Sequence, residues 1–134
     1  MSHTPLLTLA AAAFAFPAAL WFASAAAPVT AAPAPDPGQR LFLQCQACHS
    51  LARGAPHKVG PNLYGTIGAP AASRPGYAYS AALKNSGIRW DDATLDRWLE
   101  RPSAVVRGNK MIYNGMARPE QRRALIGYLK KASR

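Results

Sequence analysis

Acidic side chains are scarce in this sequence. Six Asp and Glu stand against sixteen Lys and Arg among 134 residues, which gives a formal net charge of +10 at pH 7. None of these charged residues occurs before Asp36, so the whole charge belongs to residues 36–134. A chain of this length forms one compact domain, which argues against a multidomain enzyme.

Cysteine, strand-like patterns and repeats are also scarce or missing. Cys45 and Cys48 are separated by only two residues, so a bridge between them would constrain little of the chain. No stretch of useful length alternates polar and apolar residues, and no internal repeat of roughly twenty residues or more occurs. A domain this small is marginal on its own apolar burial, so a metal or a large cofactor would help to stabilise it.

Alanine dominates the start of the chain. Residues 5–27 form an apolar stretch of 23 residues interrupted by Pro17, and no Lys or Arg precedes it. The stretch is long enough to span a bilayer, yet the small residues at 23–27 suit a signal peptidase. We expect residues 1–27 to be an export signal or an uncleaved membrane anchor, a buried helix being a third interpretation. Residues 28–37, rich in Pro and Ala, are expected to form a linker.

The remaining residues, 38–134, are predicted to be all-α. Apolar residues recur at helical spacing in 38–49, so a short helix should run into the cysteine pair. Residues 53–78 hold five of the ten Gly and four of the twelve Pro, and they are predicted to be loops that need something to wrap around. Three further helices are expected, over residues 80–85, from a cap at Asp91 or Asp92 to a stop at Pro102, and from Pro119 onward.

Residues 45–49 read Cys-Gln-Ala-Cys-His, the C-x-x-C-H pattern of covalent haem c attachment. Two thiols about one helical turn apart can each add to a haem vinyl group, and the imidazole of His49 can reach the iron from the same face. One covalently attached haem c is therefore predicted. Candidates in the domain for the sixth iron ligand are His57, Met111 and Met116.

The cysteine pair has three other interpretations. A thioredoxin-like redox pair needs a βαβ context, which the sequence lacks. A zinc site needs four ligands, whereas the chain has two Cys and three His, one of them in the apolar start. A structural disulfide or unused thiols are the third interpretation.

From Gly38 to Lys131 the chain resembles the class I c-type cytochromes, of the bacterial cytochrome c2 and mitochondrial cytochrome c type. The resemblance implies a small single-haem cytochrome c fold of three to five helices, with long Gly/Pro loops wrapped around the haem. KVGPNLYG (58–65) resembles the loop after the haem motif, which implies that the carbonyl of Pro61 accepts from His49. NKMIYNGM (109–116) resembles the segment with the axial methionine, which implies Met111 as the sixth ligand and Met116 as an apolar filler.

Two further segments resemble the family's haem-propionate contacts. PGYAYS (75–80) and GIRW (87–90) imply that Tyr79 and Trp90 donate to a propionate. Trp98 stands where many relatives have a tyrosine that donates to the methionine sulfur. Ala69 stands where an arginine near a propionate is common, which leaves Arg74 as a candidate for reaching the same carboxylate.

Departures from the family pattern also occur on the methionine side. Leu83 replaces a polar residue, which predicts a drier pocket and a raised redox potential. Arg107 and Asn109 replace a proline and a threonine that usually brace the methionine loop, which predicts weaker bracing of Met111.

Haem iron held by His49 and Met111 has no open coordination position, so the resemblance implies a one-electron carrier and not an enzyme.

The expected location is the periplasm, with membrane contact only if residues 5–27 are retained. Expected partners present acidic docking faces, as on a cytochrome bc1 complex (a quinol:cytochrome c oxidoreductase), cytochrome c oxidase or a periplasmic dehydrogenase. Nucleic acid is not expected, because no binding module is present. The alternatives are a haem subunit permanently attached to one enzyme complex, and a peroxidase or gas-binding protein with a labile methionine.

Overall fold

A computed structural model describes residues 34–134 of the chain. The predicted export signal or anchor (1–27) and residues 28–33 of the predicted linker lie outside the described residues. Within 34–134 there are five helices and no strand, and one isolated antiparallel bridge joins Pro70 to Arg89. The prediction of an all-α fold with three to five helices is confirmed. In this part of the chain, none of the helices has both the length and the apolar character needed to cross a membrane.

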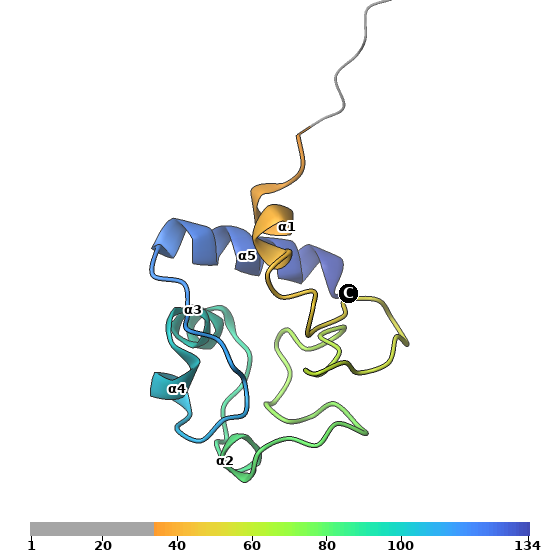
Figure 1. Cartoon of the computed structure of the whole chain (residues 1–134), viewed down its shortest axis with the longest axis vertical. Helices are drawn as coiled ribbons and strands as arrows, with labels where there is room; N and C mark the ends of the chain where they lie inside the picture. The colour runs from red at the N-terminus through yellow and green to blue at the C-terminus, as the bar shows by residue number, and fades with distance from the viewer. Residues whose placement is uncertain (1–33) are drawn as a thin grey trace, which may run out of the picture. The chain divides into compact units, whose positions relative to one another are not determined.

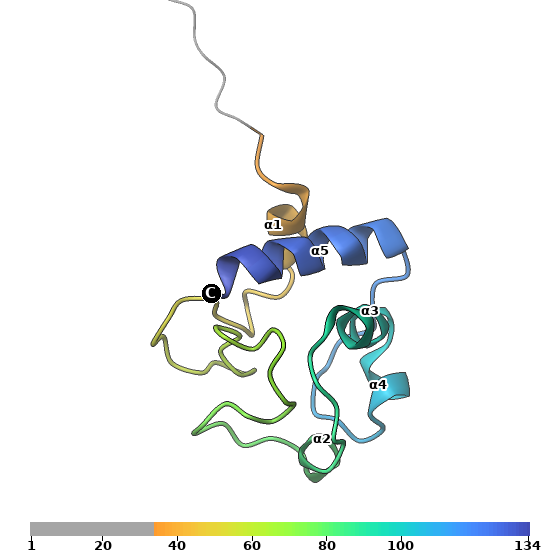
Figure 2. The same ribbon diagram turned by 180° about the vertical axis from the view of Figure 1, so that it is seen from behind.

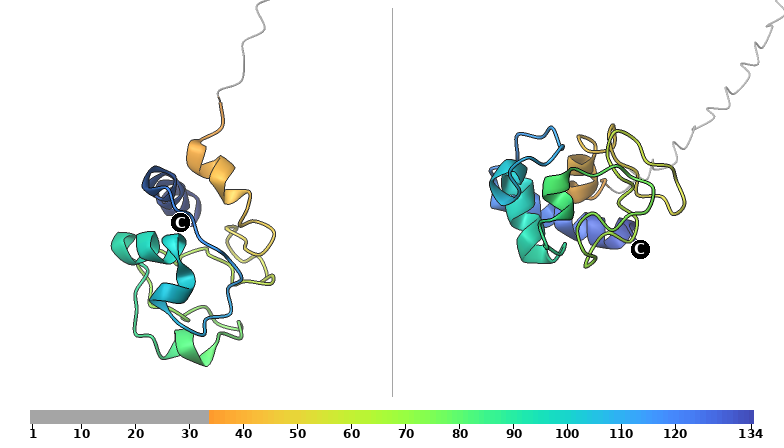
Figure 3. Two further views of the ribbon diagram at one scale, coloured as in Figure 1. Left: turned by 60° about the vertical axis from the view of Figure 1, so that its left-hand side comes forward. Right: turned by 90° about the horizontal axis from the view of Figure 1, so that it is seen from below.

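Four helices, α1, α3, α4 and α5, lie together, whereas α2 lies apart from them at the end of the long loops (Figure 1). Both α1 and α3 pack against α5, and α4 packs against α3. The view from behind shows α1 lying across α5 (Figure 2), and the side view shows the same crossing (Figure 3). The helix bounds are α1 Pro37–Phe42, α2 Ala81–Lys84, α3 Asp92–Glu100, α4 Pro102–Val105 and α5 Pro119–Ala132.

Side-chain caps explain where three of the helices begin. The carboxylate of Asp36 accepts from the Gly38 N–H at 2.7 Å, and that of Asp91 accepts from the Thr94 N–H at 2.7 Å. The hydroxyl of Ser80 accepts from the Leu83 N–H at 3.1 Å. Each cap satisfies a backbone donor that the first helical turn leaves free. Asp91 is therefore the cap of the two acidic residues considered.

The structure corrects the expected helix boundaries in three places. The first helix ends at Phe42, and hydrogen-bonded turns lead into the haem motif, with the His49 N–H donating to the Cys45 carbonyl at 2.9 Å. Pro37, assigned to the linker, is the first residue of α1. Pro102, predicted as a stop, begins the unpredicted helix α4, because a proline at the first helical position forfeits no intrahelical hydrogen bond.

Helices α1, α3 and α5 meet in the apolar core. The backbone of Gly38 lies directly against Ala124 and Tyr128 of α5, and the rings of Phe42 and Tyr128 pack at 5.8 Å between centroids. The first and last helices of the described residues are therefore in direct contact. Leu125 is fully buried at the centre, and the other buried apolar residues of this core include Leu95, Leu99, Ile126 and Leu129.

Hydrogen bonds of the buried Asn62 and of His57 hold the loops in place. The side-chain amide of Asn62 donates to the carbonyls of Ala52 and Ala55 at 2.8 and 2.7 Å. His57 accepts from the Asn62 N–H at 2.9 Å through Nδ1, and its Nε2 lies 2.8 Å from the Pro75 carbonyl. Both ring nitrogens of His57 thus bond to backbone groups, and the side chain ties two loop segments together.

Candidate functional site

His49 is held in one orientation by the loop that follows the cysteine motif. Its Nδ1 lies 2.7 Å from the carbonyl oxygen of Pro61. A carbonyl oxygen can only accept, so Nδ1 carries the proton and the Nε2 lone pair is free to bind a metal. Burial lowers the pKa of His49, which favours the neutral imidazole that a metal requires.

Gly60 makes this arrangement sterically possible. A Cβ atom at residue 60 would collide with Cε1 of the His49 ring. The Gly60 N–H also donates to the Cys48 carbonyl at 2.8 Å, which ties the loop to the haem motif. Gly60 lies within the KVGPNLYG motif, and its place beside Pro61 is the sequence signal for this role.

Cys45 and Cys48 remain separate thiols in the structure, and both line the same cavity as His49. Burial, followed by the neighbouring Cys48, raises the pKa of the Cys45 thiol. An uncharged thiol suits this apolar wall, and two thiols facing one cavity suit attachment of a single planar group through two side chains.

The loop that carries Met111 is held by hydrogen bonds close to the methionine. The side-chain carbonyl of Asn109 accepts from the Met111 N–H at 2.9 Å, and its amide donates to the Val106 carbonyl at 2.8 Å. The Lys110 ammonium donates to the Ala78 carbonyl at 2.9 Å. Asn109 was predicted to brace this loop weakly, whereas in the structure it supplies two of the loop's hydrogen bonds.

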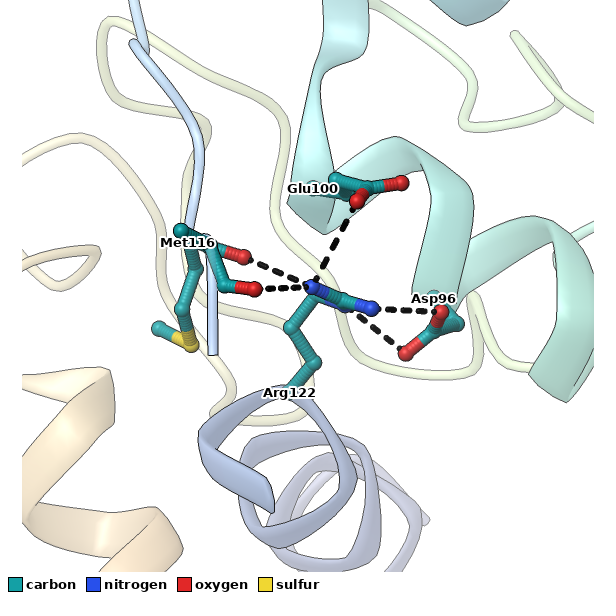
Figure 4. Close-up of polar contacts among 5 residues, drawn as sticks. Asp96, Glu100, Met116 and Arg122 are labelled. Atoms are coloured by element: carbon teal, nitrogen blue, oxygen red, sulfur yellow. Dashed lines mark hydrogen bonds and ion pairs between the residues drawn. The ribbon is translucent and has the colours of Figure 1, made fainter. Parts of the chain in front are cut away.

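The far end of the same loop is fixed by the buried guanidinium of Arg122 (Figure 4). One Nη1 atom donates to the carbonyls of Met116 and Ala117 at 3.0 and 2.9 Å, and lies 3.9 Å from the Glu100 carboxylate. The Met116 N–H donates to the Leu99 carbonyl at 2.8 Å. Sequence reasoning missed Arg122, because an arginine on a terminal helix ordinarily faces solvent.

The two other candidates for the sixth ligand are placed elsewhere. Met116 is 6% exposed and packed in the core, and it is not among the residues that line the cavity. His57 has both ring nitrogens engaged by backbone groups. Met111 alone of the three lines the cavity.

Aromatic residues close the remaining walls. Trp90 and Trp98 are buried and meet edge to face, with 5.0 Å between their ring centroids. Tyr79 packs against Tyr77 at 4.7 Å, and burial raises the pKa of its hydroxyl. Indole and phenol rings offer apolar surface together with one hydrogen-bond donor each, which suits a large apolar ligand with polar edges.

All eight residues predicted for the site line one cavity: Cys45, Cys48, His49, Pro61, Tyr79, Trp90, Trp98 and Met111. Its walls also leave three buried polar atoms without a hydrogen-bond partner in residues 34–134, namely Thr66 Oγ1, Arg74 Nε and the Tyr113 hydroxyl oxygen. A mainly apolar cavity with two thiols, a nitrogen ligand, a sulfur ligand and spare donors at its walls fits a covalently attached haem. Thr66 and Tyr113 carried no motif signal and were missed.

Comparisons with known proteins agree with this chemistry. The chain is 46% identical to cytochrome c2 of Rhodomicrobium vannielii over 112 residues, covering 84% of this chain and 86% of that protein. It is 40% identical to cytochrome c of Ginkgo biloba over 105 residues, covering 76% of this chain and 93% of that protein. The solved structure of cytochrome cH from Methylobacterium extorquens matches with a TM-score of 0.67 and 42% identity, covering 71% of this chain and 95% of that one. No family model matches the chain.

Proposed function

Because this chain belongs to the class I c-type cytochromes, which transfer electrons and are not enzymes, we propose that it exchanges single electrons with separate redox proteins in the periplasm. It carries one covalently bound haem c. The haem, when bound, supplies a one-electron iron couple. The finer proposals below concern the ligands, the partners and the location.

The carrier function rests on one observation: His49 and Met111 line the same cavity, and we propose that they are the two protein ligands of the iron. The Pro61 carbonyl holds the His49 proton on Nδ1, and Asn109 holds the backbone of Met111, while Trp90 and Trp98 exclude water from the walls. Two protein ligands leave no position for a substrate at the iron. We expect Met111→Ala to lose the sulfur-to-iron absorption of the oxidised protein, while Met116→Leu retains it. Retention of that band in Met111→Ala would contradict this ligand assignment.

Tyr79 and Trp90 are proposed to donate hydrogen bonds to the haem carboxylates, and Trp98 to pack beside the methionine. Support comes from their places in the cavity wall and from the single donor that each ring carries. Trp90→Phe removes the indole donor while keeping an aromatic ring. We expect the haem-loaded variant to unfold at a lower temperature than the haem-loaded wild type. Equal thermal stability of the two proteins would contradict the assignment.

Charge and exposed apolar residues support docking to acidic partner faces. Residues 37–90 and 101–119 contain no Asp or Glu. Two cavity-wall residues are exposed apolar side chains, Val59 at 78% and Ile112 at 101%, and their neighbours Lys58 and Lys110 are basic. An apolar contact bordered by cations fits an acidic docking face, as proposed for a cytochrome bc1 complex, a cytochrome c oxidase or a periplasmic dehydrogenase.

Charge reversal tests this docking surface. We expect Lys110→Glu to slow electron transfer with an isolated partner at low ionic strength and to lose the effect at high salt. Lys131→Glu is the matched control, because Lys131 pairs with Asp36 beside α1 and does not line the cavity. Equal rates for the two variants would remove Lys110 from the docking surface.

Two alternatives have distinct signatures. A peroxidase or gas-binding protein would bind carbon monoxide rapidly and stoichiometrically in the native reduced state, which the two-ligand proposal does not allow. A permanently attached subunit would co-purify with one enzyme. The intact mass of the protein in membrane and soluble fractions of its native host separates a carrier cleaved after residues 1–27 from one tethered by residues 5–27.

A further inference from the structure

The cavity wall contains a positive charge without a counter-ion from the protein. Arg74 lines the cavity, and its Nε is buried without a hydrogen-bond partner. The ion pairs found in residues 34–134 involve Arg122, Lys130 and Lys131, and none includes Arg74. A guanidinium keeps its charge in a protein, and shielding its donor from water without a partner is costly. The wall is therefore built to meet an anion.

A second spare donor lies beside this guanidinium. Nη1 of Arg74 is 3.4 Å from the position that a Cβ atom would take at Gly65, so the guanidinium rests against the backbone next to Thr66. The Thr66 hydroxyl oxygen is likewise buried, unpartnered and in the cavity wall. An arginine fork and a hydroxyl together form a suitable set of donors for a carboxylate.

The third unpartnered group, the Tyr113 hydroxyl, lies at a different edge of the cavity from Arg74. Burial raises the pKa of Tyr113, and the neighbouring Cys45 adds to this rise, so the Tyr113 hydroxyl lies on the Cys45 side of the cavity. Arg74 is instead near Tyr79: burial raises the pKa of the Tyr79 hydroxyl, and Arg74 acts to lower it. In a haem the two carboxylates lie on the half of the macrocycle opposite the vinyl groups. Attachment at Cys45 and Cys48 therefore turns the carboxylates away from Tyr113.

We propose that Arg74 and Thr66 bind one carboxylate of the haem, and that the Arg74 charge keeps this carboxylate ionised in both oxidation states near neutral pH. Electron uptake is then not coupled to proton uptake at this group. The proposal rests on the haem-binding function above. It assigns a positioning role to two residues that contact the cofactor edge and not the iron.

Other titratable and charged groups around this edge must be distinguished from the carboxylate. They are Tyr77 and Tyr79, His57 bonded to the Pro75 carbonyl, Arg89 bonded to the Gly68 carbonyl, and Lys110 bonded to the Ala78 carbonyl. Arg89→Gln is the matched control, because it removes the same charge from an exposed residue of this region and leaves His57 and both tyrosines in place.

The experiment is redox potentiometry of the haem-loaded protein between pH 5 and 9, for wild type, Arg74→Gln, Arg74→Lys and Arg89→Gln. Loss of the cation favours oxidised iron, so Arg74→Gln should have a lower midpoint than either wild type or Arg89→Gln. Its midpoint should also fall with pH where that of wild type is flat, with a slope approaching about 59 mV per pH unit if one proton accompanies each electron. Arg74→Lys should restore most of the wild-type profile. Identical profiles for Arg74→Gln and Arg89→Gln would overturn the proposal.

Two further readouts keep the result unambiguous. If Arg74→Gln fails to load haem, Thr66→Val provides the test, with a smaller change in the same direction expected; a wild-type profile for Thr66→Val would remove Thr66 from the carboxylate site. The ferrous haem c spectrum is recorded for every protein. A wild type without that spectrum would contradict the proposed function, whereas loaded variants with unchanged profiles would contradict only the carboxylate site.

Discussion

Arg122 on α5 grips Asp96 on α3 through two parallel hydrogen bonds, from Nε to Oδ1 at 2.8 Å and from Nη2 to Oδ2 at 3.0 Å. The remaining donor capacity of the same guanidinium goes to the backbone of Met116 and Ala117. One side chain therefore joins two core helices to the end of the loop that presents Met111. A planar fork with five donors can do this, whereas a lysine could not satisfy all these acceptors at once.

We expect Asp96→Asn to destabilise the protein at pH 7 but not in strong acid. Hydrogen bonds from Arg122 hold the pKa of Asp96 below its usual value of 3.8. A folded-state pKa below the unfolded one gives stability that is complete above the unfolded pKa and is lost as pH falls through the folded pKa. Urea unfolding should show a gap between wild type and variant that closes on acidification below about pH 4.

Asp92→Asn is the control for that experiment. Asp92 pairs with Lys130 in an exposed position, where an ion pair contributes little, so its gap should be small at every pH. A gap for Asp96→Asn that stays constant down to strong acid would show that the charge on Asp96 is not what stabilises the fold.

Two helical glycines should respond oppositely to the same substitution. A Cβ at Gly38 collides with the Ala124 backbone, whereas a Cβ at Gly127 meets nothing within 4 Å. We expect Gly127→Ala to raise the free energy of unfolding by about 1 kcal/mol through helix propensity alone. Gly38→Ala should lower it by forcing α1 from α5. Thermal unfolding of the two haem-loaded variants measures both effects, and matching shifts would contradict the close packing of these helices.

Asn109→Ala should weaken the hold on Met111. The variant loses the hydrogen bonds to the Met111 N–H and the Val106 carbonyl, each worth about 1 kcal/mol. Because one pH unit corresponds to about 1.4 kcal/mol, ligand exchange in alkali should begin roughly one unit lower than in wild type. A pH titration of the oxidised spectrum measures this. An unchanged titration would mean that the Arg122 end of the loop is sufficient to hold the methionine.

Leu83→Asn should lower the redox midpoint. Leu83 is half-buried in the cavity wall on α2, where an apolar side chain favours the less charged reduced iron. Ala81→Asn introduces the same side chain at an exposed position of the same helix and should leave the midpoint near that of wild type. A midpoint for Leu83→Asn at or above wild type would contradict a role for the dry wall in setting the potential.

The sequence was most informative where chemistry or backbone geometry constrains local residues. Cys45, Cys48 and His49 lie within five consecutive residues of one motif. Asp91 and Pro119 mark helix starts through capping and the fixed backbone angle of proline. Arg122 bonds to Asp96, which is distant in the chain, and the burial of Thr66 in the cavity wall depends on the fold, so nothing in their immediate sequence neighbourhood distinguishes these two from surface residues. Asn109 is a related case: its departure from the family pattern was visible in the sequence, but its two hydrogen bonds, to the Val106 carbonyl and from the Met111 N–H, were not.

The long irregular segment from 53 to 78 has a consequence for assembly. It forms much of the cavity wall and, within itself, contains neither helix nor strand to hold it closed. Cys45 and Cys48 line the cavity that these loops enclose. Closed loops would therefore hinder access of the haem to the two thiols. We therefore expect the two thioether bonds to form before these loops close, so that the loops take up their final arrangement around the bound haem.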